Sequence, residues 1–205
     1  NDSIISRNGS ALSSLLNFNS PIYFKENGLG MVASPSFRGT TAQQTVVIWN
    51  GININSQLIG QTDFNTLTTR GFNSITVNPG GGSTIYGTSA IGGSVHLSNL
   101  LSFEKQFSNR ISLSYGSFAT LGLEYQMNYA TEQISTQITL SRNSSDNDYP
   151  YLNTNQVNEN GAFYNNNFGV NVGYKIDNQN YLKFYSNYFE SERHFSGTLV
   201  TTSKN

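Results

Sequence analysis

The sequence contains no cysteine, few charged residues and no long apolar run. Without cysteine, disulfide frameworks, zinc–cysteine sites and thiol catalysis are excluded. Charged residues make up 11% of the 205 residues and the formal net charge is -1, so there is no basic field to hold nucleic acid. Because no run of 18 apolar residues occurs, no transmembrane helix can be drawn. Membrane-spanning strands would show only alternating apolar and polar residues, which is a weaker signal.

The residues that are abundant favour strands and turns. The chain has 12 Tyr and 13 Phe against one Trp, and it is otherwise rich in Asn, Ser, Thr and Gly. Its character changes near Leu100. Before that point short mixed segments alternate with glycine, and after it long alternating segments dominate, which indicates two regions.

The first region predicts a small α+β domain. Leu12, Leu15 and Leu16 recur at helical spacing in Ala11 to Asn17, behind Ser10 as a candidate N-cap. Three strands are predicted at Thr45 to Trp49, Ile75 to Val77 and Ser94 to Ser98. We expect these strands to share one mixed sheet that the leucine helix covers.

The second region predicts long antiparallel strands with one apolar and one polar face. Five are expected near 110–116, 120–130, 134–142, 167–177 and 181–190. They approach the 9 to 11 residues of a membrane-spanning strand rather than the roughly 5 to 6 of an average strand. The connections are tight at 131–133 and 178–180 and long at 143–166, as in outer-membrane barrels. A soluble β-sandwich also alternates and stays the alternative.

Two charged features are candidates for sites. Asp146 and Asp148 flank Asn147 in the only cluster of acidic and amide oxygens, the ligands that Ca²⁺ prefers, although the spacing is not that of an EF-hand. A solvated loop is the favoured interpretation, and a metal site at Asp146 and Asp148 is the weaker alternative. Arg38 precedes Gly39 in a strand-like context, where an unpaired cation would be costly. We therefore expect Arg38 to be largely buried and paired with a carboxylate, with barrel segments absent from this chain as one candidate source of that carboxylate.

Several motifs of the first region, in order and at fitting spacing, resemble the plug domain of TonB-dependent receptors. They are Phe37-Arg38-Gly39, then Val46 to Asn55, then Ser83-Thr84-Ile85-Tyr86-Gly87, then Ala90 to Val95. The resemblance covers about residues 10 to 98, and the alternating strands follow where the family has its barrel. The sequence from Ser36 to Thr45 is similar to that of a cobalamin-receptor-like branch of the family found in Bacteroidetes.

The chain departs from the family pattern at two places. Asn50 stands where the family usually has an acidic residue, and Asn78-Pro79-Gly80 stands where it usually has Arg-Gly-Pro. The second plug arginine that would pair with the barrel wall is missing. Arg38 is then the one obvious plug anchor.

The resemblance implies an outer-membrane transporter of a Gram-negative bacterium, without enzymatic activity or cofactor. A scarce, bulky ligand such as cobalamin or a metal chelate would bind from outside, and TonB, with its inner-membrane energising complex, would drive import. A surface lipoprotein and outer-membrane lipid are further candidate partners. In the apical plug loops the expected ligand contacts are Gly28, Leu29, Gly30, Asn53, Asn55, Ser56, Gln57, Leu58 and Gln61; in the barrel loop they are Tyr149 and Tyr151.

These inferences give a fold class and a domain division. We expect an α+β plug domain at 1–100, followed at 101–205 by antiparallel strands of an incomplete transmembrane β-barrel. Five strands cannot close around a domain of some hundred residues, because plugged transporters use about 22. We therefore expect the remaining strands either in a part of the natural protein that is missing here or in another chain. The alternative function is a soluble or surface β-rich carbohydrate-binding module.

Overall fold

The computed structural model describes residues 11–26, 28, 30–80 and 82–197. Within them the chain divides into two compact units at Leu100 and Leu101. No helix in these ranges has the length and apolarity needed to cross a membrane. The candidate Ser10 cap, Leu29 and Gly81 lie outside the described residues.

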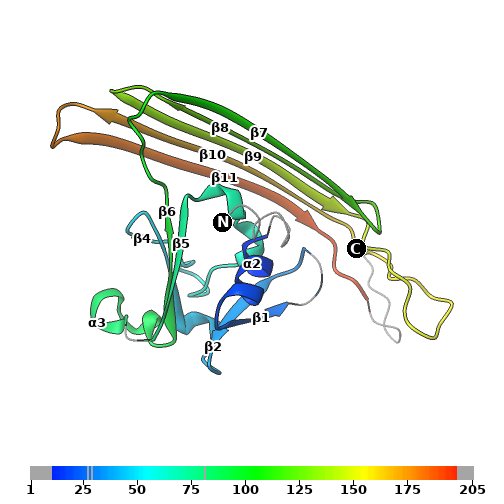
Figure 1. Ribbon diagram of the computed structural model, residues 1–205. Coiled ribbons are helices and arrows are strands. Elements are labelled where there is room, and N and C mark those ends of the chain that lie inside the picture. Colours follow the sequence, from blue (N-terminus) through cyan, green and yellow to red (C-terminus); the bar gives the residue numbers. More distant parts are fainter. Residues whose placement is uncertain (1–10, 27, 29, 81, 198–205) are drawn as a thin grey trace. The chain divides into compact units, whose positions relative to one another are not determined.

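A four-stranded mixed sheet forms the centre of the first unit (Figure 1). Its order is β4 (Ile52–Asn53), β3 (Thr45–Trp49), β6 (Gly93–Ser98) and β5 (Ser74–Pro79). Strands β3 and β6 are parallel, and β5 runs antiparallel to β6. The prediction that the three segments share one mixed sheet is confirmed.

Helix α2 (Leu12–Asn19) covers this sheet. Its leucines Leu12, Leu15 and Leu16 share one buried cluster with Val47 of β3 and Val95 of β6. Apolar residues at i, i+3 and i+4 lie on one helix face, so the predicted leucine stripe is the buried face. The helix extends two residues beyond the predicted Asn17, and Ala11 occupies the N-cap position without a side-chain hydrogen bond.

A hairpin of β1 (Ile22–Glu26) and β2 (Ala33–Phe37) precedes the sheet and was not predicted. Pro35 interrupts the alternation of β2 and hides the strand in the sequence. The short helices are η1 (Ala42–Gln44), η2 (Phe64–Thr66), η3 (Thr69–Gly71), α3 (Ser83–Tyr86) and η4 (Thr88–Ala90). They carry the chain between the strands.

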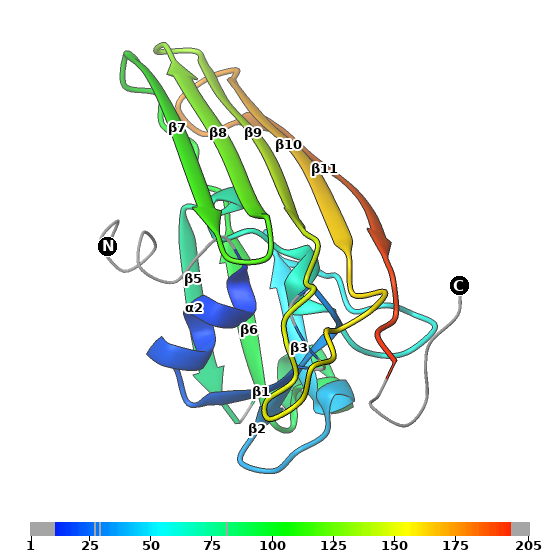
Figure 2. The ribbon, with the colours of Figure 1, turned by 90° about the vertical axis from the view of Figure 1, so that its right-hand side faces the viewer.

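The second unit is one antiparallel sheet whose five strands follow the order of the chain (Figure 2). They are β7 (Gln106–Gly116), β8 (Thr120–Ala130), β9 (Ile134–Ser145), β10 (Phe163–Lys175) and β11 (Tyr181–Arg193). With 11 to 13 residues each, they are long enough to span a bilayer. The predicted α+β region followed by antiparallel strands is confirmed.

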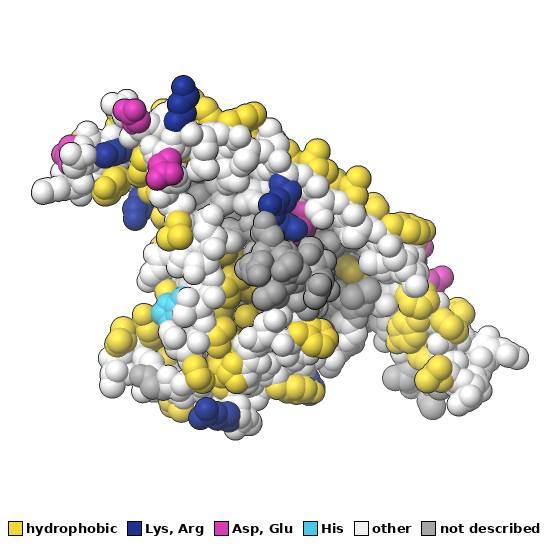
Figure 3. Space-filling view, in the orientation of Figure 1, with side chains coloured by type: hydrophobic (Ala, Val, Ile, Leu, Met, Phe, Trp, Pro, Cys, Tyr) yellow, Lys and Arg dark blue, Asp and Glu magenta, His cyan; other side chains and the backbone are white. Residues whose placement is uncertain are grey.

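One face of this sheet, the outward face, exposes its apolar side chains. Leu113 is 73% exposed and Ile111 68%, and Tyr188 and Phe184 of β11 are similarly exposed. Figure 3 shows apolar side chains, in yellow, along the upper edge of the view, where the five-stranded sheet lies. A soluble sandwich would bury such a face against a second sheet, so this arrangement suits a strand wall that faces lipid.

The opposite face is polar and is crossed by a chain of amides. Asn171 of β10 donates to Gln137 of β9 at 2.9 Å, and Gln137 donates to Asn128 of β8 at 3.2 Å. Asn128 in turn donates to Ser108 of β7 at 3.3 Å. These residues are direct neighbours in the strand register, so the ladder of side chains supports the register of four strands.

Candidate functional site

The loop Asn53 to Gln61 is held in one shape by the side chain of Asn55. Its Oδ1 accepts the backbone N–H of Val47 at 2.9 Å, and its Nδ2 donates to the carbonyls of Thr45 at 2.9 Å and Gly60 at 3.0 Å. Thr62 Oγ1 also donates to Asn55 Oδ1 at 3.3 Å. Asn55 was predicted to contact ligand, but these bonds commit its side chain to the loop.

A tight turn forms the tip of this loop. The backbone N–H of Gly60 donates to the carbonyl of Ser56 at 2.8 Å, and Ser56 Oγ accepts the N–H of Leu58 at 3.3 Å. Gly60 has φ 71°, which favours glycine. The turn presents Leu58, which is 93% exposed, beside the exposed Gln57.

The other expected residues of this loop lie close to the tip. Asn53 Oδ1 accepts the N–H of Asn55 at 2.9 Å. The carbonyl of Gln61 accepts the N–H of Ser56 at 3.1 Å. Ile59 is 53% exposed and extends the apolar tip. The loop thus presents an apolar tip, Leu58 and Ile59, in a fixed conformation with amide side chains beside it.

The second expected contact region joins β1 to β2. Gly28 and Gly30 have φ 119° and 73°, values at which other residues are strained. The carbonyl of Met31 accepts Asn65 Nδ2, and Asp63 Oδ1 accepts the backbone N–H of Ala33 at 3.0 Å. Asp63 and Asn65, which follow the Asn53 to Gln61 loop, therefore stabilise the connection between β1 and β2.

Arg38 lies in a turn and not in a strand. It follows the last residue of β2, has φ 49° and is exposed. Among the described residues its side chain makes no ion pair or hydrogen bond. The strand-like context expected for Arg38 is instead a turn at Arg38-Gly39, where the side chain is exposed among the described residues. Its expected pairing with a carboxylate on another part of the receptor stays a prediction.

In the second unit, the expected contacts Tyr149 and Tyr151 belong to an aromatic row. Their ring centroids are 5.6 Å apart, and Tyr149 lies 6.2 Å from Phe118 of the β7–β8 turn, all at edge-to-face angles. Tyr151 donates its hydroxyl toward Asn158 Oδ1 at 3.2 Å. Edge-to-face rings at such distances stabilise one another, so the loop has a fixed aromatic side.

The loop 146–162 is ordered by buried amides. Asn158, 2% exposed, donates its Nδ2 to the carbonyl of Asn147 at 2.6 Å. The N–H of Asn147 donates to Ser145 Oγ at 3.1 Å. Buried amides at Asn147 and Asn158 therefore hold the path of this loop.

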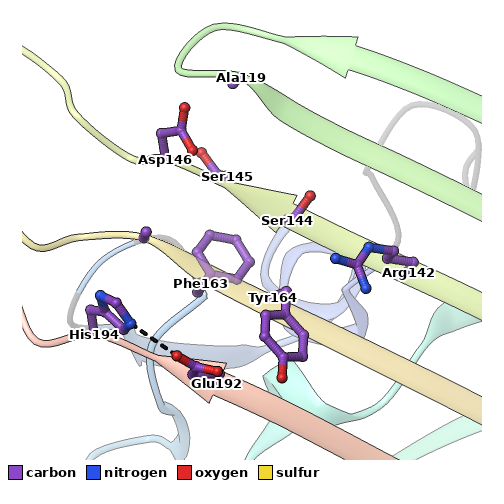
Figure 4. A pocket seen from close by; sticks show the side chains of 10 residues that line it. Ala119, Arg142, Ser144, Ser145, Asp146, Phe163, Tyr164, Glu192 and His194 are labelled. Carbon is purple, nitrogen blue, oxygen red and sulfur yellow. Dashed lines mark hydrogen bonds and ion pairs between the residues drawn. The ribbon is translucent and has the colours of Figure 1, made fainter.

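Asp146 and Asp148 point away from this buried core and are exposed. Across the described ranges no group of three His, Cys, Asp or Glu side chains could hold a metal ion. Asp146 instead lines a pocket of about 170 Å³ at this end of the sheet, with Arg142, Tyr164, Glu192 and His194 (Figure 4). His194 Nε2 lies 3.1 Å from Glu192 Oε1.

The supporting residues Asp63, Asn65, Phe118 and Asn158 were missed. Asp63 and Asn65 do form an Asx-type turn, since Asp63 Oδ1 also accepts the N–H of Asn65 at 3.0 Å, and such a turn has a sequence signature. The partners of Phe118 and Asn158 lie seven or more residues away. No local pattern indicates them.

The chain matches known proteins along its first half. Residues 1–94 match the model of the TonB-dependent Receptor Plug Domain. The chain is 30% identical over 92 residues to the vitamin B12 transporter BtuB of Vibrio vulnificus, covering 45% of this chain and 15% of the transporter. It is 33% identical over 70 residues to the vitamin B12 transporter BtuB of Photobacterium profundum, covering 34% and 12%.

Solved structures match both units. The copper transporter OprC aligns with a TM-score of 0.74 at 19% identity, covering 91% of this chain and 28% of OprC. The ferric enterobactin receptor PfeA of Pseudomonas aeruginosa, solved as a mutant with enterobactin, aligns with a TM-score of 0.67 at 15% identity, covering 89% and 31%. At these identities the likeness shows the fold. The chain spans less than a third of each relative.

The plug-domain match, the strands behind it and the exposed apolar outward face agree with one another. TonB-dependent receptors are outer-membrane proteins of Gram-negative bacteria, and they are transporters, not enzymes. The first part of the chain, residues 1–94, is thus a TonB-dependent receptor plug domain, and five antiparallel strands of an incomplete barrel follow it.

Proposed function

We propose that this chain is the plug, at 1–100, and the first barrel strands, at 101–205, of a receptor that imports a scarce, bulky ligand. The ligand binds from outside, and TonB with the inner-membrane energising complex drives import. A cobalamin-like compound or a metal chelate is the proposed ligand class. The relatives named for vitamin B12, copper and ferric enterobactin support this class.

The observation that carries this proposal is the rigid loop Asn53 to Gln61. Asn55 fixes its shape from inside, so Gln57 and Leu58 are presented without the entropy cost of ordering a flexible loop. A site of this kind combines an apolar surface with a few placed amides. That combination suits a large ligand with both polar and apolar surface.

Gly28, Gly30, Tyr149 and Tyr151 are proposed as further contacts. The glycines leave backbone groups open to close approach, and the tyrosines offer ring faces with a polar tip. Arg38 is proposed as a plug anchor toward parts of the receptor other than the described residues.

A β-rich carbohydrate-binding module is the rival function. Such a module would cover its apolar sheet face, whereas Leu113 and Ile111 are 73% and 68% exposed here. This favours the receptor.

The test is ligand-dependent thermal stabilisation of the complete receptor, measured with cobalamin, haem, siderophores and oligosaccharides. A ligand that binds the folded state raises the unfolding temperature with concentration. Leu58→Ser should weaken the binding of the ligand that stabilises the receptor by about 1.5–3 kcal/mol, the free energy of burying a leucine side chain. Ile85→Ser is the matched control, because Ile85 is also exposed, at 76%, in α3 of the same unit. Equal effects of the two variants would remove Leu58 from the site.

A further inference from the structure

The outward face of the five-stranded sheet has a groove of about 360 Å³. Its apolar wall comes from residues of four neighbouring strands, β8 to β11: Leu123, Tyr125, Leu140, Phe168 and Tyr188. Tyr125, Leu140, Phe168 and Tyr188 are directly opposite one another in the register. The volume is within the range of about 300–1,000 Å³ for sites that bind small molecules. The groove is continuous with the apolar face that an outer-membrane receptor turns toward lipid.

The charges of this face are confined to its loop end. Side chains of a strand alternate between faces, so the register identifies every described strand residue that shares the outward face with Leu140. Only Arg142, Glu190 and Glu192 are charged among them. Arg142 is the single cation of that set, and it lines the groove.

Arg142 has spare capacity to bind an anion. Its Nη1 donates to Asn166 Oδ1 at 3.0 Å, and its guanidinium carbon lies 5.2 Å from the centroid of the Tyr164 ring. No carboxylate of a described residue is within ion-pair distance of it. A guanidinium has five N–H donors, so most of them are not used by these contacts. A cation on a lipid-facing surface is costly unless an anion or interfacial water meets it.

The two carboxylates have other partners and lie to one side. Glu190 accepts from Asn166 at 3.5 Å, and Glu192 lies 3.1 Å from His194 (Figure 4). Glu190 is two strands from Arg142 in the same row, roughly 10 Å at the usual strand spacing. On the other side of Arg142 the neighbour is Leu123. An anion can therefore approach Arg142 over β8, away from both carboxylates.

We propose that this groove binds one acyl chain of a phosphate-bearing membrane lipid whose phosphate is held by Arg142. The chain would lie along Leu140 and Phe168, and the phosphate would accept the free N–H groups of the guanidinium. Arginine matches phosphate in charge and in bidentate geometry. Tyr125 and Tyr188 border the groove, in keeping with the enrichment of tyrosine near membrane interfaces. The inference rests on the outer-membrane location and not on the transported ligand.

The test uses the complete receptor, delipidated in an uncharged detergent, and native mass spectrometry to count bound lipid. Dioleoyl phosphatidic acid is compared with dioleoylglycerol, which has the same chains without the phosphate, and with inorganic phosphate. We expect the phosphatidic acid to bind at least about tenfold more tightly than dioleoylglycerol. Inorganic phosphate at the same concentration should not displace it.

Two variants test the residue. Arg142→Gln should lower the affinity for phosphatidic acid about tenfold, and Arg142→Lys should keep part of it. Arg110→Gln, an arginine on the opposite face of the same sheet, is the matched control and should bind as wild type. Two results would overturn the proposal. One is equal affinity of the wild-type receptor for phosphatidic acid and dioleoylglycerol, and the other is unchanged affinity of Arg142→Gln for phosphatidic acid. Displacement by inorganic phosphate would show a free-phosphate site and also overturn it. The wild-type comparison decides the matter even if a variant fails to insert.

Discussion

Asn50 and Asn99 hold each other by two reciprocal hydrogen bonds. Asn50 Oδ1 accepts the backbone N–H of Asn99 at 2.8 Å, and Asn50 Nδ2 donates to Asn99 Oδ1 at 3.1 Å. Asn99 Oδ1 also accepts Trp49 Nε1–H at 2.7 Å. The pair ties the end of β3 to the residue after β6, next to the boundary between the two units.

This pair explains why an amide suits the position where the family usually has an acidic residue. Asn50→Asp would keep the acceptor, lose the donor and place a carboxylate against Asn99 Oδ1. We expect it to destabilise the plug by about 1–3 kcal/mol. Asn50→Ala should also speed hydrogen exchange at the Asn99 amide. Asn78→Ala is the control, because Asn78 is an exposed amide of β5, and it should leave that exchange unchanged.

The second prediction concerns the amide inside the apical loop. Asn55→Asp keeps the acceptor for Val47 but turns a carboxylate toward the carbonyls of Thr45 and Gly60. We expect a loss of about 1–3 kcal/mol and faster proteolysis within 53–61. Asn53→Ala removes only the contact with the N–H of Asn55 and should have a smaller effect. Equal cleavage rates for wild type and Asn55→Asp would show that the loop does not depend on this clamp.

The third prediction concerns Arg38. Its φ of 49° costs a non-glycine residue roughly 1–2 kcal/mol, so Arg38→Gly should be neutral or stabilising if the side chain makes no contact in the receptor. We expect the opposite: a looser plug and greater sensitivity of cells to large antibiotics, because the anchor would be lost. Arg38→Lys, which keeps the charge, should retain part of the wild-type resistance. Resistance as in wild type for Arg38→Gly would make Arg38 a surface charge.

The fourth prediction concerns pH at the β10–β11 turn. Asp177 accepts from the Asn180 side chain and from the N–H groups of Gln179 and Asn180. The side-chain hydrogen bond of Asn180 is the main cause that lowers the pKa of Asp177 below its ordinary value of 3.8. A lowered carboxyl pKa gives a stabilisation that is present above the ordinary value and is lost as the pH falls through the folded value.

Amide exchange at Gln179 and Asn180 measures this effect. After correction for the intrinsic pH dependence of exchange, protection should be constant from neutral pH down to the ordinary carboxyl range and fall below it. Asp177→Asn should lower protection at neutral pH and remove the pH dependence. A turn in Asp177→Asn that still loosens in acid would assign the change to another group.

The sequence predicted those elements in which apolar residues recur at a short, regular spacing. The alternation in β7, β8 and β9 gave their centres, and the leucine spacing gave α2. The start of β10 was set four residues late, at Asn167 rather than Phe163, because polar residues follow Phe163 and Tyr164 there. Pairing with β9 continues the strand through them, and such pairing is not visible in one segment.

Side-chain roles were less predictable than elements. Asn55 was expected to face ligand and Arg38 to be buried. Both depend on the local path of the backbone: a turn at Arg38 and Gly39, and carbonyls of Thr45 and Gly60 that converge on one amide. A composition rich in asparagine does not distinguish an amide that holds a loop from one that meets a ligand.

The most direct test of TonB-driven import is ligand uptake by cells. A radiolabelled form of the compound that stabilises the purified receptor is supplied to cells that express the complete receptor, with and without TonB. We predict accumulation inside the cells only when TonB is present, with equal binding at the surface in both strains. Equal accumulation in the two strains would contradict TonB-driven import.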